Sequence, residues 1–164
     1  MEKTNAMRIL DKAKVRYLCH YYEHGDGAID GISVAEKLCQ PVSQVFKTLV
    51  TKGNGLNYFV FVIPVAEELD LKAAARAAGQ KSVQLIPVKE INAVTGYIRG
   101  GCSPIGMKKP YPVVIDESVL MQSTVMISGG KIGCQVEIAP TDLIHLTNAK
   151  TATLTMPSTG GSYS

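Results

Sequence analysis

The chain has 164 residues, of which 46% are hydrophobic and 19% are charged, and its formal net charge is +3. This composition suits one compact domain with a sizeable core and excludes an intrinsically disordered chain. The small positive charge excludes the strongly basic surfaces of proteins that wrap duplex DNA, so we expect no DNA partner. A few lysines on one face could still contact phosphates.

The N-terminal segment MEKTNAMRILDKAK is amphipathic and lacks the apolar centre of a signal peptide. No apolar run approaches the roughly 20 residues that span a membrane. The four cysteines form no Cys-x-x-Cys pair, so we expect a cytoplasmic protein with reduced thiols and no membrane partner. A zinc site built from Cys19, His20, His24 and Cys39 would match no structural zinc spacing. We therefore expect no metal and no cofactor.

The first half of the chain alternates between helical and strand periodicity. Its expected elements, in chain order, are a helix over 4–14, a strand over 15–23, a helix over 33–40, a hairpin over 47–65 and a helix over 70–79. Thr4 and Asp70 are suited to cap the first and last of these helices, and Ser33 with Glu36 has the spacing of a capping box. The Asn54-Gly55 pair between two apolar runs is typical of a hairpin.

The second half predicts a strand over 82–87, a short helix over 88–96, strands over 111–116, 123–130 and 131–140, and a helix over 141–148. Hairpins mixed with helices argue against a purely parallel doubly wound sheet. We therefore expect an α/β fold in which helices pack around a mixed, strongly curved, barrel-like sheet. This single domain is expected to cover residues 1–150. The small, polar, proline-containing segment 151–164 predicts a flexible tail.

The common nucleotide-binding and catalytic motifs are absent, among them the P-loop, the Rossmann glycine fingerprint, the G-x-S-x-G elbow and H-E-x-x-H. What remains is the run RGGCSPIGMKKP at 99–110, together with SGG at 128–130. Glycine-rich backbone can present N–H groups to a phosphate or to a developing oxyanion. Ordinary turns are the alternative for both segments. Cys102 could be a nucleophile, but the favoured interpretation is a small loop filler.

Lys47 lies at the start of a predicted strand, where the period of two places it on the same face as Leu49. If Leu49 faces inside, Lys47 points to the concave side and needs an anionic or carbonyl partner. The alternative is a strand-end lysine that extends to water. The residues alone leave both possibilities open.

Three motifs occur together: FKTLV at 46–50, GYIRGGCSPIGMKK at 96–109 and SGGKIGCQVEIAPTDL at 128–143. In order and spacing they resemble the YbaK/EbsC-type aminoacyl-tRNA deacylases, and the resemblance covers residues 5–148. These proteins are free-standing relatives of the editing domain in bacterial prolyl-tRNA synthetase. The resemblance implies a cleft for the aminoacylated 3′ end of tRNA and cleavage of an aminoacyl ester. It makes aminoacyl-tRNA the expected partner and prolyl-tRNA synthetase a candidate partner.

The resemblance also assigns roles by position. Lys47 would be catalytic, and Cys102 stands where we expect an apolar residue. Substrate contacts are implied for a larger set, namely Tyr22, Thr48, Gly100, Gly101, Ser103, Ser128, Gly129 and Gly130. We also expect three lysines to meet the phosphates of the acceptor stem, Lys108, Lys109 and Lys131.

Within the family, these motifs resemble the Cys-tRNA(Pro) deacylases more than the Ala-tRNA(Pro) deacylases. The implied function is the removal of cysteine from mischarged Cys-tRNA(Pro), and also from Cys-tRNA(Cys). Because the sequence offers no obvious general base, the resemblance suggests that the thiol of the substrate attacks its own ester. Two alternatives stay open: an Ala-tRNA(Pro) deacylase of the same fold, and a non-catalytic module that binds tRNA or a synthetase.

Overall fold

The computed structural model describes residues 3–55 and 57–156. Its helices are α1 (Asn5–Lys12), α2 (Gly31–Lys37), α3 (Leu71–Ala77), α4 (Ile91–Thr95) and α5 (Pro140–Thr147), with 3₁₀ turns at Val88–Glu90 and Glu117–Met121. Its strands are β1 (Tyr17–Tyr21), β2 (Phe46–Lys52), β3 (Tyr58–Pro64), β4 (Gln84–Leu85), β5 (Val113–Asp116), β6 (Val125–Ser128), β7 (Cys134–Ile138) and β8 (Lys150–Ala152). The predicted order of helices and strands is confirmed, and β8 is an additional strand.

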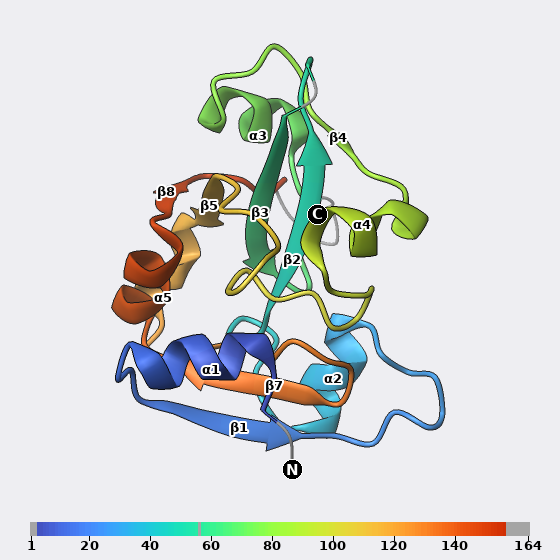
Figure 1. Cartoon of the computed structure of the whole chain (residues 1–164), viewed down its shortest axis with the longest axis vertical. Helices are drawn as coiled ribbons and strands as arrows, with labels where there is room; N and C mark the ends of the chain where they lie inside the picture. The colour runs from blue at the N-terminus through green and yellow to red at the C-terminus, as the bar shows by residue number, and fades with distance from the viewer. Residues whose placement is uncertain (1–2, 56, 157–164) are drawn as a thin grey trace, which may run out of the picture.

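The strands form two open sheets. The first is antiparallel, in the order β1-β7-β6, and the second is mixed, in the order β4-β2-β3-β5-β8. Figure 1 shows the long β2–β3 hairpin rising from the smaller sheet. The sheets meet beside the start of β2, where Met126 N donates to Gln44 O over 2.9 Å. A mixed α/β fold is therefore confirmed. The prediction of a barrel-like sheet was wrong, because neither described sheet closes on itself.

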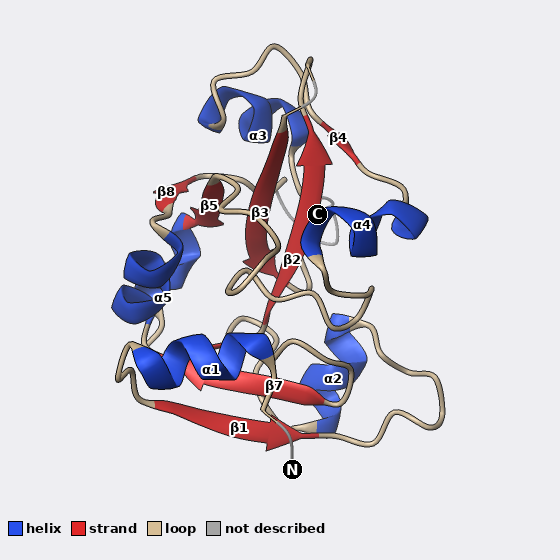
Figure 2. Cartoon of the chain, viewed as in Figure 1, coloured by secondary structure: helices blue, strands red, loops and turns tan. Residues whose placement is uncertain are grey.

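Helix α1 packs along β7, as Figure 2 shows. Its apolar face places Met7 and Leu10 in the same core as Val136 of β7. Full burial of a side chain of this size contributes about 1.5–3 kcal/mol. Thr4 caps the helix by accepting from Met7 N over 3.1 Å, as predicted, and its hydroxyl also donates to Gly129 O. The first turn of α1 is thus fixed to the turn between β6 and β7.

Helix α2 starts earlier than the sequence pattern suggested. Asp30 is its N-cap: one carboxylate oxygen accepts from Ser33 N over 3.1 Å, and the other accepts from Ser33 Oγ over 2.7 Å. The predicted Ser33–Glu36 capping box is therefore wrong, because Ser33 lies inside the first turn. A carboxylate three residues ahead meets the free N–H groups of the helix and interacts favourably with its dipole.

The domain continues past residue 150. Strand β8 pairs in parallel with β5, and the side chain of Leu154 is fully buried beside Phe61. Leu154 N also donates to a carboxylate oxygen of Asp116 over 2.9 Å. The expected tail is thus wrong for residues 151–155, because these backbone and apolar groups are paired and buried. Residues 157–164 of that tail lie outside the described residues.

None of the helices in residues 3–55 and 57–156 has the length and apolarity that a membrane crossing requires.

Candidate functional site

A cavity of about 390 Å³ lies where the two sheets meet. Its walls come from the start of β2 at residues 45–49, from residues 29–32 at the start of α2, and from the loop over residues 99–110 after α4, which we call the glycine-rich loop. The ends of the smaller sheet complete it with Tyr22, Ser128 and Gln135. The fold thus brings the three sequence motifs into one place, although they are far apart along the chain.

Lys47 lines this cavity and is half-buried. It pairs with Ile63 across the hairpin and shares a strand face with Leu49, as predicted. Burial lowers the pKa of the Lys47 ammonium, and the carboxylates of Glu68 and Glu67 act in the opposite direction. No ion pair within the described chain includes Lys47. Its partly desolvated charge is therefore available to an anionic or carbonyl group of a ligand.

Two further polar groups in the cavity wall have no hydrogen-bond partner within residues 3–55 and 57–156. Tyr22 and Gln135 are 8% and 7% exposed, and neither Tyr22 Oη nor Gln135 Oε1 has a hydrogen-bond partner among the described residues. A buried polar atom left unpaired costs about 1–3 kcal/mol. Such atoms are rare in folded proteins. Both atoms are therefore available to the polar groups of a ligand in the cavity.

Gln135 was missed by the sequence reasoning. It alternates with apolar residues along β7, next to Val136, and such a position is normally turned to solvent. On the same strand face Glu137 is partly exposed and bonds to His20 over 2.8 Å. Gln135 and Glu137 thus share a strand face, but Gln135 is buried in the cavity wall and Glu137 is partly exposed.

Gly100 forms part of the cavity wall, in a tight turn. Gly101 N donates to Ile98 O over 2.9 Å, and Gly100 has a φ of +83°, which favours glycine. The Gly100 N–H has no acceptor within residues 3–55 and 57–156, whereas the Gly101 N–H is already engaged. Contact between Gly100 and a ligand therefore remains a prediction, while Gly101 supports the turn.

Gly101 and residues 103–106 form the back of this loop, whereas Cys102 between them lines the cavity. A Cβ on Gly101 would come within 2.9 Å of Lys131 Cα, so the loop presses directly on the β6–β7 turn. Ser103 is fully buried and does not line the cavity; its Oγ accepts from Ile105 N over 3.2 Å. Asn5 Nδ2 of α1 donates to Gly106 O over 2.8 Å. The run of small residues is thus a bonded scaffold, which holds Gly100 in place.

The second glycine pair, Gly129 and Gly130, also makes its contacts within the protein and not with the cavity. Ser128 lines the cavity, and its Oγ accepts from Gly130 N over 3.1 Å. Gly129 N donates to Cys134 O over 2.9 Å, and a Cβ on Gly129 would meet Cys134 Sγ at 2.6 Å. Gly130 has a φ of +102° and lies against Thr4. Both glycines therefore allow a compact turn, and of this trio only Ser128 faces the cavity.

Of the nine predicted site residues, five line the cavity: Tyr22, Lys47, Thr48, Gly100 and Ser128. The other four, Gly101, Ser103, Gly129 and Gly130, lie behind its wall. Arg99 and Asp30 also line the cavity and were not predicted. The Asp30 carboxylate caps α2, whereas the Arg99 side chain is exposed.

Cys102 lines the cavity, and burial raises the pKa of its thiol to about 11. The thiol is therefore protonated near neutral pH and is a weak nucleophile. None of the described histidines lines the cavity. The side chains considered as a zinc site do not cluster, since no three His, Cys, Asp or Glu residues of the described segments could hold a metal together.

The sequence of this chain is similar to those of known proteins. A protein of Enterococcus faecalis provisionally named Cys-tRNA(Pro)/Cys-tRNA(Cys) deacylase EbsC is 45% identical over 154 residues, which cover 94% of each chain. The YwhH protein of Bacillus subtilis is 27% identical over 116 residues, or 71% of this chain and 73% of that protein.

The fold matches the crystal structure of a protein provisionally described as a trans-editing enzyme for prolyl-tRNA synthetase. The TM-score is 0.80 at 24% identity, and the match covers 96% of this chain and all of the other. The aminoacyl-tRNA editing domain matches residues 28–146, which include the three motifs and most of the cavity wall. This chain therefore belongs to the aminoacyl-tRNA editing domain family.

Proposed function

We propose that this protein is a trans-editing aminoacyl-tRNA deacylase that removes cysteine from mischarged Cys-tRNA(Pro), and also from Cys-tRNA(Cys). One observation carries the proposal: a single cavity combines a half-buried lysine with two buried polar atoms that lack partners in the described chain. The provisional name of the Enterococcus faecalis relative supports this choice of substrate. Because Cys-tRNA(Pro) arises when prolyl-tRNA synthetase attaches the wrong amino acid, we include that synthetase as a partner and the cytoplasm as the location.

The cavity has groups that complement an aminoacyl ester. Its volume of about 390 Å³ suits a small ligand. The α-ammonium group of the substrate is a hydrogen-bond donor, and Tyr22 Oη and Gln135 Oε1 can accept from it. The ester carbonyl gains negative charge during cleavage, and the Gly100 N–H and the Lys47 ammonium can stabilise that charge. Arg99, exposed in the cavity wall, can bind the phosphate next to the terminal adenosine.

The nucleophile is proposed to come from the substrate. Cys102 is protonated near neutral pH, and no described histidine is in the cavity to act as a base. A cysteinyl thiol has an ordinary pKa of about 8.5, and a nearby ammonium lowers it further. The thiolate sulfur bonds to the carbonyl carbon, the bond from that carbon to the ribose oxygen breaks, and the ribose oxygen takes up a proton. The product is a cyclic thiolactone, which water then opens.

This route makes attack effectively unimolecular, so the protein mainly positions the ester and stabilises the charge on its oxygen. Serine, with a hydroxyl in place of the thiol, ionises much less readily. We therefore expect cysteinyl ester to be cleaved at least about 100-fold faster than seryl ester on the same tRNA.

The decisive experiment measures single-turnover release of labelled amino acid from tRNA(Pro) charged with cysteine, serine or alanine. Rapid cleavage of the cysteinyl ester with slow cleavage of the seryl ester is the expected result. Equal cysteinyl and seryl rates would mean that water is the nucleophile. Preferential cleavage of the alanyl ester would favour the Ala-tRNA(Pro) alternative. Binding without release of any of the three would identify a non-catalytic module.

A further inference from the structure

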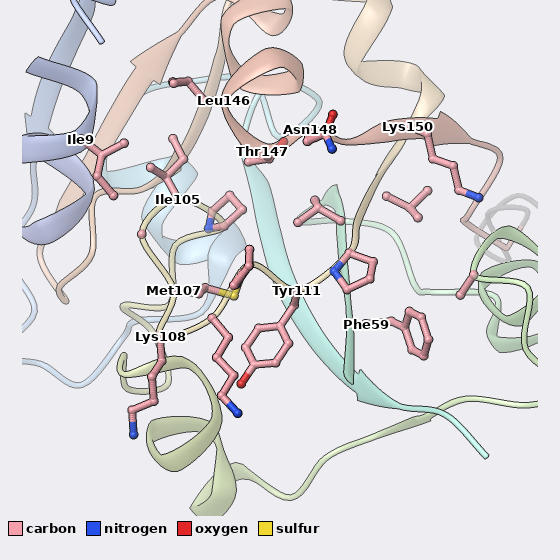
Figure 3. A pocket seen from close by; sticks show the side chains of 18 of the residues that line it. Ile9, Phe59, Ile105, Met107, Lys108, Tyr111, Leu146, Thr147, Asn148 and Lys150 are labelled. Carbon is pink, nitrogen blue, oxygen red and sulfur yellow. The ribbon is translucent and has the colours of Figure 1, made fainter. Parts of the chain in front are cut away.

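A second and larger cavity, of about 690 Å³, lies on the other side of the glycine-rich loop. The loop contributes Gly100 and Cys102 to the candidate site, whereas its continuation over residues 104–114 lines the second cavity. The remaining walls come from the end of α5 with β8, the end of α3, Phe59 and Ile9 (Figure 3). One continuous segment thus borders both cavities.

The polar groups of this second cavity are mainly cationic. Three exposed lysines line it, Lys108, Lys109 and Lys150, and none of its described lining residues carries a carboxylate. We refer to the cavity as the lysine groove. Figure 3 shows Lys108 and Lys150 on opposite sides of it, with the ring of Tyr111 between them. Lys109 and Lys150 belong to no ion pair within residues 3–55 and 57–156, so no internal carboxylate neutralises this charge.

The groove also has a fixed aromatic surface. Tyr111 Oη donates to Val94 O over 2.7 Å, and its ring packs edge-to-face on Tyr58 with 5.8 Å between the centroids. Lys108 Nζ donates to Ala93 O over 3.1 Å. Tyr111 and Lys108 are therefore held in place before any ligand arrives, and Ile105 and Met107 add an apolar floor. Cations around an apolar and aromatic floor suit an RNA strand, which offers phosphates and stacking surfaces.

We propose that the lysine groove binds the phosphate backbone of the tRNA acceptor end while the aminoacylated 3′ end occupies the candidate site. This inference rests on the proposed function, because it takes tRNA as the substrate. The sequence suggested phosphate contacts for Lys108, Lys109 and Lys131; the structure adds Lys150 from β8 and leaves Lys131 out of the groove. The groove supplies affinity that is independent of sequence, since phosphate contacts carry no base information.

The test uses uncharged tRNA(Pro), so its result does not depend on catalysis. Binding is measured by fluorescence anisotropy at several salt concentrations for three proteins: the wild type, the double variant Lys109→Gln/Lys150→Gln, and the control Lys81→Gln/Lys89→Gln. The control lysines are exposed, line neither cavity and remove the same charge. We expect the groove variant to bind about tenfold more weakly, with a log–log salt slope smaller by roughly 0.9 for each phosphate that it no longer neutralises.

An unchanged affinity and salt slope in the groove variant would overturn the proposal, as would an equal loss in the control. Loss of prolyl-tRNA synthetase binding with tRNA binding intact would overturn it in favour of a protein interface.

A second measurement separates this proposal from the deacylase proposal. We compare cleavage of full-length Cys-tRNA(Pro) with cleavage of a cysteinyl ester of the CCA trinucleotide, which is too short to carry the acceptor stem. The groove variant should raise KM for the full-length substrate and leave kcat/KM for the short one unchanged. Equal losses on both substrates would contradict the groove. Failure of the wild type to cleave either substrate would refute the deacylase, while the anisotropy result still decides the groove.

Discussion

The candidate site and the lysine groove lie on opposite sides of one loop and differ in character. The site is the smaller cavity, about 390 Å³ against about 690 Å³ for the groove. It contains a half-buried Lys47, and the Tyr22 and Gln135 oxygens in it have no hydrogen-bond partner among the described residues. In the groove, by contrast, the hydroxyl of Tyr111 is already bonded and Lys150 is exposed.

The proposed division of roles follows this difference in burial and pairing, and not the volumes of the two cavities. A polar group that is buried without a partner has a cost in folding free energy, and a ligand can recover it. An exposed lysine has no such cost and offers long-range attraction to a polyanion. We therefore assign bond cleavage to the smaller cavity and affinity to the larger one. Four predictions test this division, from the largest expected effect to the smallest.

Lys47→Ala should reduce kcat/KM for Cys-tRNA(Pro) by about 100-fold or more, since removal of one preorganised stabilising group typically costs that much. The fold should remain, because Lys47 makes no ion pair in the described chain. Lys52→Ala, at the other end of the same strand and outside both cavities, is the matched control and should keep normal activity. Single-turnover rates and thermal unfolding report both quantities. Near-normal cleavage by Lys47→Ala would remove this residue from the mechanism.

Gly101→Ala should destabilise the protein by about 1–3 kcal/mol, because the added Cβ overpacks the loop. That atom would approach Lys131 Cα to 2.9 Å, and backbone on both sides would have to move. Gly25→Ala is the control, since its Cβ would meet nothing within 4 Å. Urea unfolding gives the free energy of unfolding for both variants. Equal stability of the two would mean that the loop yields easily and does not hold Gly100 in place.

The two tyrosines should respond differently to loss of the hydroxyl. Tyr22→Phe removes a buried oxygen that has no partner in the described part of the chain, so stability should stay level or rise by up to about 1 kcal/mol, while kcat/KM falls about tenfold. Tyr111→Phe removes the bond to Val94 O, so stability should fall by about 0.5–1.5 kcal/mol. Its cleavage of the cysteinyl CCA ester should be unchanged. A clear loss of stability in Tyr22→Phe would show that its hydroxyl serves the fold.

Cys102→Ala and Cys102→Ser should both keep activity within about threefold of the wild type, because a protonated thiol is a poor nucleophile. The pKa of about 11 keeps this thiol protonated throughout the neutral range and releases its proton only as pH approaches that value. The pH–rate profile of Cys102→Ala should therefore overlay that of the wild type below about pH 9. If both variants were folded and inactive, the enzyme would have its own nucleophile and the substrate-thiol route would fail.

Local signals in the sequence were sufficient for most elements. Thr4 and Asp70 cap their helices as predicted, and the segment containing Asn54-Gly55 joins the two strands of the central hairpin. These features depend on residues a few positions apart, which is the range over which backbone hydrogen bonds and turn geometry act. The strand face that Lys47 shares with Leu49 was also predictable, because it depends only on two residues that lie two positions apart. The order and spacing of three motifs were enough to indicate the family.

Only the tertiary structure decided which of these residues meet. It placed Tyr22, Lys47 and Gly100 around one cavity and Ser103 behind the wall of that cavity. It also revealed Gln135, because alternation along a strand gives a residue its face but not what covers that face. The split into two sheets and the pairing of β8 with β5 depend on contacts between distant segments, about which a local pattern carries no information. The sequence determined the elements and the family, whereas the packing of α2 and the glycine-rich loop between the sheets determined the site.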